Sequence, residues 1–132
     1  MKIQTILFLA VLLTLINTDL ALTQTFHPKA ISPDEYESLV KTTGEVSVID
    51  VRTPEEMGKG HLPGATNIDY KNDNFKRTIS TLDKSKTYLL YCKTGIRSEE
   101  AANAMKKAGF TQIYFLKGGI EAWQEAEKPI EK

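Results

Sequence analysis

Alternation between strand-like and helix-like segments is the feature that most constrains the fold of this chain. Apolar runs rich in β-branched and aromatic residues predict strands at 46–51, 87–91 and 113–116, with shorter extended pieces at 29–31 and 66–69. Helical spacing or capping signals occur between these runs, at 32–41, 73–82, 98–108 and 119–127. Because strands that alternate with helices pair in parallel, we predict an α/β domain with a mostly parallel sheet of about five strands and helices on both faces.

Local signals indicate where helices and loops begin. Residues 32–35, Ser-Pro-Asp-Glu, combine a capping serine, a first-turn proline and a glutamate that can complete a capping box. Ser98 is expected to cap a later helix, which Gly109 ends. The segment 52–65 is rich in glycine and proline, so we expect a loop with at most one helical turn at 54–57.

Length and charge limit the domain count and the partners. After a leader and a linker at 22–28, residues 29–129 have the length of one domain with one core. Lys plus Arg and Asp plus Glu both number 17, so bulk charge gives no argument for nucleic acid or for an anionic membrane surface.

The first 21 residues have the pattern of a secretory signal peptide. Lys2 precedes an apolar run at 3–16 that is too short to span a bilayer comfortably. We predict cleavage near Ala21 or Thr23, export to the periplasm or alternatively the extracellular space, and no stable membrane association after the leader is removed. An uncleaved N-terminal anchor is the other interpretation of this segment.

Cys92 is the only cysteine, so the chain cannot form an internal disulfide. A free thiol in an oxidising compartment is either buried and inert or chemically employed. Cys92 follows the strand at 87–91 and precedes a short turn into a helix, which is where ligands bind in open α/β sheets. Gly95 lets this turn curl, so that its amides can converge on the sulfur and stabilise a thiolate.

Charged and polar neighbours support the same chemistry. The helix N-terminus, the converging amides and the cations Lys93 and Arg97 all favour the ionised form, so we predict a lowered pKa for a reachable, nucleophilic Cys92. Arg97 offers a planar fork for an oxyanion, and Thr94 can add a hydroxyl donor. An ion pair between Arg97 and Glu99 or Glu100 is the structural alternative and can coexist with ligand binding.

Three stretches of this sequence resemble the single-domain rhodanese family. Residues 50–67 resemble its N-terminal signature, 92–98 (Cys-Lys-Thr-Gly-Ile-Arg-Ser) its active loop, and 116–123 its closing signature. The resemblance implies a rhodanese-like fold and a thiosulfate sulfurtransferase that carries sulfur as a persulfide on Cys92. Small sulfur-containing anions and thiol acceptors are then the partners, the protein is expected to be a monomer, and no cofactor is implied. The implied substrate-binding residues are Lys93, Thr94, Gly95, Ile96 and Arg97, with Asp50, Arg52 and Ser98 in supporting positions.

The length of the active loop bears on the substrate. Related phosphatases have one residue more between cysteine and arginine, so the spacing from Cys92 to Arg97 favours sulfur over phosphate and disfavours a phosphatase or arsenate reductase. A persulfide carrier or redox partner protein that does not turn over is the main alternative to an enzyme. No metal site is predicted, because His61 has no neighbours at ligand spacing, and we expect it to form a structural hydrogen bond.

Overall fold

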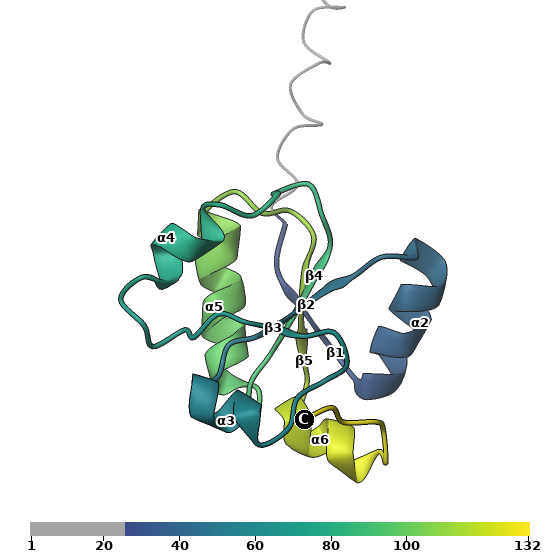
Figure 1. The fold of residues 1–132 in the computed structure, drawn as a ribbon. Helices are drawn as coiled ribbons and strands as arrows, with labels where there is room; N and C mark the ends of the chain where they lie inside the picture. Colours follow the sequence, from purple (N-terminus) through teal and green to yellow (C-terminus); the bar gives the residue numbers. More distant parts are fainter. Residues whose placement is uncertain (1–25) are drawn as a thin grey trace, which may run out of the picture.

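A parallel five-stranded sheet organises residues 26–132, the part of the chain that the computed structural model describes (Figure 1). The strands run in the order β1-β5-β4-β2-β3, and every neighbouring pair is parallel. The predicted fold class is therefore confirmed. The strands are β1 (Lys29–Ile31), β2 (Ser47–Asp50), β3 (Thr66–Asn67), β4 (Tyr88–Tyr91) and β5 (Ile113–Leu116).

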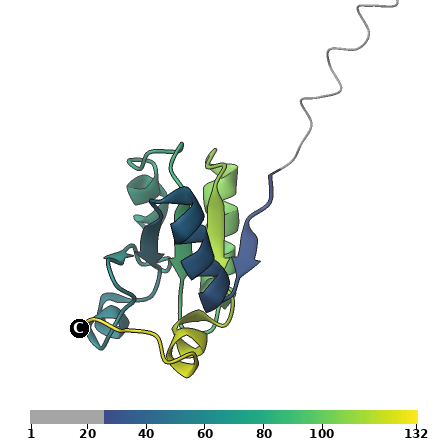
Figure 2. The ribbon, with the colours of Figure 1, turned by 90° about the vertical axis from the view of Figure 1, so that its right-hand side faces the viewer.

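Helices cover both faces of this sheet, as predicted. Figures 1 and 2 show α4 and α5 on one face, α2 on the other, and α3 and α6 near the edge where the strands end. The helices are α2 (Pro33–Thr43), α3 (Pro54–Gly58), α4 (Phe75–Ile79), α5 (Ile96–Lys107) and α6 (Gly119–Glu125).

All four predicted helices differ from the structure by one or more residues at their ends, and two of these differences have a clear local cause. Helix α4 is half as long as the predicted 73–82 helix, because side chains at both of its ends bond to nearby backbone: Asn72 accepts from the N–H of Asn74, and Ser80 donates to the Arg77 carbonyl. Helix α5 begins before Ser98, so the predicted capping role of Ser98 was wrong.

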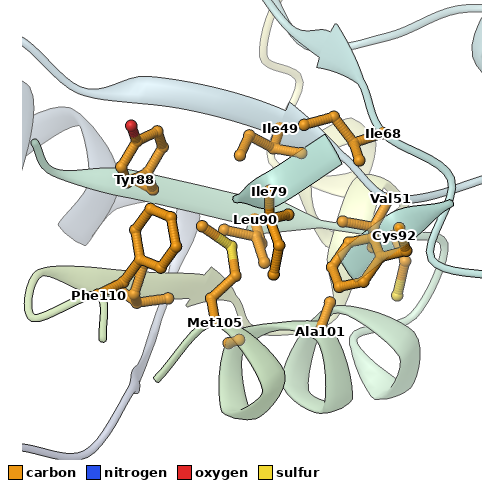
Figure 3. Packing of buried hydrophobic residues seen from close by; sticks show 13 residues of the cluster. Ile49, Val51, Ile68, Ile79, Tyr88, Leu90, Cys92, Ala101, Met105 and Phe110 are labelled. Carbon is orange, nitrogen blue, oxygen red and sulfur yellow. The ribbon is translucent and has the colours of Figure 1, made fainter. Parts of the chain in front are cut away.

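The hydrophobic core has one part on each face of the sheet. β4 is buried on both faces, as its apolar sequence predicted. The part under α4 and α5 extends from Tyr88 and Phe110 to Cys92, which lies at one end of it (Figure 3). The part on the other face is formed chiefly by buried side chains of β1, β4, β5 and α6, including Leu89, Tyr91 and Trp123.

The C-terminal tail returns to the edge where the strands end. Glu131 exchanges two backbone hydrogen bonds with His61, each of 2.9 Å, and the indole N–H of Trp123 donates to the carbonyl of Pro129 at 2.8 Å. The tail is thereby fastened to the loop between α3 and β3.

The predicted leader lies outside the described residues. Within residues 26–132, no helix has the length and apolar character needed to cross a membrane.

Candidate active site

Cys92 lies directly after β4, and its turn leads into the first turn of α5 at Ile96. Its side chain is 1% exposed, so the sulfur is less reachable than the sequence suggested. The Gly95 N–H donates to Sγ at 3.1 Å. The thiol donates to Ser98 Oγ at 3.6 Å, and this hydroxyl donates to the Gly95 carbonyl at 3.0 Å. Among these contacts, the Gly95 N–H is the one that donates to the sulfur, and such a bond favours an ionised sulfur over a neutral thiol.

The electrostatic environment favours the ionised sulfur. Burial raises the pKa of the Cys92 thiol, and the Ser98 side chain is the strongest of the groups that lower it. Backbone N–H groups of Thr94, Gly95 and Ser98 also lower this pKa, so the net value is below that of an ordinary cysteine. The Ser98 hydroxyl can rotate from the Gly95 carbonyl towards a thiolate and donate to it.

This environment predicts how Cys92 reacts with iodoacetamide at different pH values. Alkylation requires the thiolate, so a lowered pKa places the rise of the rate at lower pH than for cysteine in a peptide. In Ser98→Ala the rise of the alkylation rate should move to higher pH. Burial still raises the pKa of Cys92 in this variant, while the hydroxyl of Ser98 that lowers this pKa is lost. An unchanged profile in Ser98→Ala would show that the hydroxyl does not stabilise the sulfur. Ser85→Ala, far from the loop, is the control.

The start of α6 supports the cysteine turn from behind. The N–H of Ile120 donates to the Cys92 carbonyl at 2.9 Å, and the N–H of Glu121 donates to the Lys93 carbonyl at 3.2 Å. Gly119 allows this close approach, because a Cβ there would stand 2.5 Å from the Cys92 carbonyl oxygen. The first turn of α6 therefore holds the cysteine turn through two backbone hydrogen bonds, and Gly119 leaves room for them.

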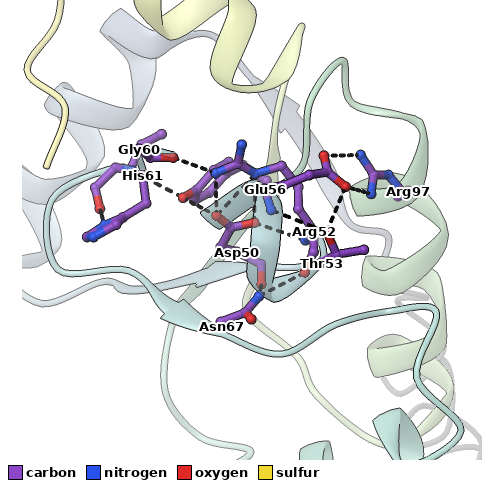
Figure 4. A network of polar contacts seen from close by, with 10 residues as sticks. Asp50, Arg52, Thr53, Glu56, Gly60, His61, Asn67 and Arg97 are labelled. Atoms are coloured by element: carbon purple, nitrogen blue, oxygen red, sulfur yellow. Dashed lines mark hydrogen bonds and ion pairs between the residues drawn. The ribbon is translucent and has the colours of Figure 1, made fainter. Parts of the chain in front are cut away.

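A buried polar network lies beside the loop (Figure 4). Asp50 is 0% exposed and accepts from Arg52 Nε at 3.0 Å and Nη2 at 2.7 Å, and from the Tyr91 hydroxyl at 2.7 Å. Burial raises the pKa of Tyr91, which therefore remains a neutral donor. Arg52 also donates to the Gly60 carbonyl at 2.8 Å, so the network joins β2, β4 and the loop after α3.

Both cations of the active loop face carboxylates. The terminal nitrogens of Arg97 bond the two oxygens of Glu56 at 2.8 and 2.9 Å, so the partner of Arg97 is neither Glu99 nor Glu100. Lys93 lies 3.8 Å from Glu121, and its side chain is 63% exposed.

The remaining predicted residues occupy different surroundings. Ile96, in the predicted substrate-binding set, is a large apolar side chain that is 68% exposed. His61 Nδ1 lies 2.9 Å from the Leu62 carbonyl, the kind of structural hydrogen bond predicted for it. Residues 26–132 contain no cluster of three or more His, Cys, Asp or Glu side chains that could hold a metal ion.

Three residues that shape the site carried no predicted role. Glu56 and Gly119 belong to the stretches that resemble the family, and Tyr91 is the last residue of the strand predicted at 87–91. The adjacent glycines 118 and 119 at a helix start were the one signal that could have indicated a close backbone approach.

The fold and the site together define an α/β domain with a hydrogen-bonded cysteine loop at the carboxyl edge of a parallel sheet. The family model described as the rhodanese-like domain matches residues 32–126, and the chain belongs to this family.

Several proteins of known sequence or structure are similar to the chain. It is 39% identical over 99 residues to a protein named probable adenylyltransferase/sulfurtransferase MoeZ of Mycobacterium tuberculosis, covering 75% of this chain but only 25% of that one. It is 35% identical over 81 residues to the thiosulfate sulfurtransferase GlpE of Shewanella oneidensis, covering 61% of this chain and 78% of that one. The solution structure of the rhodanese-like domain of an Anabaena protein matches with a TM-score of 0.69 and 27% identity, over 80% of each chain. The chain thus spans a quarter of the length of the mycobacterial relative.

Proposed function

We propose that this chain is a sulfurtransferase that moves sulfane sulfur from thiosulfate, or from a similar donor, to cyanide or a thiol acceptor. The observation that carries the proposal is the set of donors around Cys92 Sγ, which lowers the pKa of a buried thiol. A thiolate at the end of a parallel strand is a suitable sulfur nucleophile. Membership of the rhodanese-like family and relatives named as sulfurtransferases agree with this chemistry.

The proposed reaction has two steps. The Cys92 thiolate attacks the outer sulfur of thiosulfate; a bond forms between Sγ and that sulfur, the bond to the sulfonate sulfur breaks, and sulfite leaves with the electron pair. The acceptor thiolate or cyanide then attacks the outer sulfur of the persulfide and returns Cys92 as a thiolate. The loop amides hold the sulfonate oxygens, and Arg97, whose terminal nitrogens bond Glu56, contributes its positive charge. The amide of Gly95 stabilises the thiolate before and after each cycle.

Export is part of the proposal. It is supported by the positively charged start and short apolar run of residues 1–21. We propose that the mature protein acts as a monomer in the periplasm, with the extracellular space as the alternative.

The proposal is tested by intact mass spectrometry of protein purified from the exported fraction of the producing cells. We expect a mature chain that starts near residue 22 and that gains one sulfur atom after thiosulfate treatment. The added sulfur should be lost on adding cyanide, and Cys92→Ser should never acquire it. Absence of the protein from the exported fraction would contradict export, and a chain that keeps its first residues would contradict cleavage of the leader. Sulfur acquired by Cys92→Ser would contradict the role of Cys92.

Steady-state thiocyanate formation separates the enzyme from its alternatives. Repeated turnover supports the enzyme, whereas a readily formed persulfide with negligible turnover indicates a carrier for another protein. Release of phosphate from an aryl phosphate that is lost in Cys92→Ala would instead indicate a phosphatase.

A further inference from the structure

The ion pair between Glu56 and Arg97 joins α3 to the active loop (Figure 4). Each terminal nitrogen of the guanidinium bonds a different carboxylate oxygen, at 2.8 and 2.9 Å. The edge of the guanidinium best suited to grip two oxygens of an anion is thereby occupied by a residue of the protein. The Glu56 carboxylate is itself held in place, because the hydroxyl of Thr53, the residue that caps α3, donates to Glu56 Oε1 at 3.3 Å and accepts from the Glu56 N–H at 3.3 Å.

Glu56 carries its charge throughout the pH range in which sulfur transfer takes place. The hydrogen bond from Arg97 lowers the pKa of the Glu56 carboxyl to about 2. The pair is only partly shielded from water, with side-chain exposures of 20% for Arg97 and 32% for Glu56. The positive charge of the loop is therefore balanced by a permanent negative charge next to it.

A cavity of about 440 Å³ beside the loop is similarly balanced in charge. It contains the lysines Lys59 and Lys93 and the carboxylates Glu56 and Glu121. The fifth charged group in its wall, Arg52, is bound to buried Asp50. When Arg97, Asp50 and the Cys92 thiolate are included, four cations and four anions surround the loop, so a donor with two negative charges meets no surplus of positive charge among these groups.

We propose that Glu56 is a positioning residue that sets donor specificity, holding Arg97 so that the loop selects singly charged sulfane-sulfur donors over dianions. This inference rests on the proposed function and refines it. Thiosulfate is a dianion, and an organic thiosulfonate, in which a carbon group replaces one oxygen, is a monoanion with the same reactive sulfur–sulfur bond. With the monoanion, the Cys92 thiolate bonds to the outer sulfur and a sulfinate leaves in place of sulfite. The second charge of thiosulfate is repelled both by the thiolate and by Glu56.

The experiment compares kcat/KM for thiosulfate and for methanethiosulfonate in Glu56→Gln. Removal of the negative charge should raise the kcat/KM for thiosulfate, relative to the kcat/KM for methanethiosulfonate, by about tenfold. Most of this change should come from a lower KM for thiosulfate. Glu55→Gln is the matched control, because Glu55 is a neighbouring exposed carboxylate of α3, and it should leave the ratio unchanged. Glu56→Asp, which restores the charge, should bring the ratio back towards that of the original protein.

Two outcomes would overturn the inference. An equal loss of kcat/KM with both donors in Glu56→Gln would show that Glu56 has a merely structural role. If neither kcat/KM value changes, the charge of Glu56 does not affect the donor. Thermal unfolding of each variant establishes that it is folded.

Anion binding provides a readout that needs no turnover. Sulfate, a dianion, and methanesulfonate, a monoanion, are tested for protection of Cys92 against iodoacetamide. In Glu56→Gln, the sulfate concentration that gives half-maximal protection should fall about tenfold relative to that of methanesulfonate. Equal changes for both anions would contradict the proposal. If the original protein forms no persulfide with either donor, the proposed function fails, whereas this measurement still decides the role of Glu56.

Discussion

Replacing Gly119 by alanine is expected to reduce the rate of Cys92 persulfide formation by about 100-fold, because catalytic geometry tolerates displacements of less than about 1 Å. The new Cβ would stand 2.5 Å from the Cys92 carbonyl oxygen and closer still to that of Lys93. Both contacts are with backbone, so no side chain can move aside. Gly119 also has a φ of +61°, which an alanine adopts only at a cost. The cysteine turn must therefore shift, and its amides leave the sulfur.

Gly44→Ala is the control for this variant. Gly44 also has a positive φ, of +80°, but a Cβ there would meet nothing within 4 Å, and it lies at the end of α2, away from the loop. Gly44→Ala should lose some stability and keep its rate of persulfide formation, measured by mass spectrometry at short times after thiosulfate is added. A normal rate in Gly119→Ala would show that α6 does not position the cysteine turn.

Asp50→Asn is expected to lower the free energy of unfolding by about 3–5 kcal/mol, the usual effect of removing one partner of a buried ion pair. Asparagine has the same shape but no charge, and its NH2 group would face N–H groups of Arg52. Arg52 is 6% exposed and would become a buried cation without a counter-ion. Typical domains have only about 5–15 kcal/mol of stability, so this loss should be visible in urea unfolding followed by fluorescence of Trp123.

The exposed residue Asp34 provides the comparison for Asp50. Its carboxylate bonds Lys128 at 2.9 Å, but the Asp34 side chain is 89% exposed. Asp34→Asn should leave the urea midpoint almost unchanged, because water replaces the lost partner. Equal effects of the two substitutions would indicate that the network around Asp50 does not stabilise the fold.

The sheet and the cysteine loop were predictable from local sequence. β-branched runs such as Val48-Ile49 form strands because they fit a buried pleated surface, and the boundaries of β5 agree with those predicted. The position of Cys92 between a strand and a helix followed from the same alternation, as did the amides that surround its sulfur.

Contacts between distant segments were not predictable in the same way. Glu56 and Arg97 are 41 positions apart, and nothing in their local patterns shows that α3 lies against the active loop. Local candidates such as Glu99 were chosen instead because helix neighbours are the only partners that spacing indicates. The capping role of Ser98 failed for a related reason: Gly95, with a φ of +111°, starts α5 earlier than a side-chain cap would.

The pairing of Glu131 with His61 determines where labels and fusion partners can be attached. The C-terminus lies near the ends of the strands, where Cys92 is, whereas the chain enters β1 from the opposite end of the sheet (Figures 1 and 2). A purification tag or surface linkage placed after Lys132 would crowd the approach of sulfur donors and pull on the segment that fastens the loop after α3. An attachment between the proposed cleavage point and β1 leaves that approach open, so immobilised protein or a reporter fusion should be built from that side.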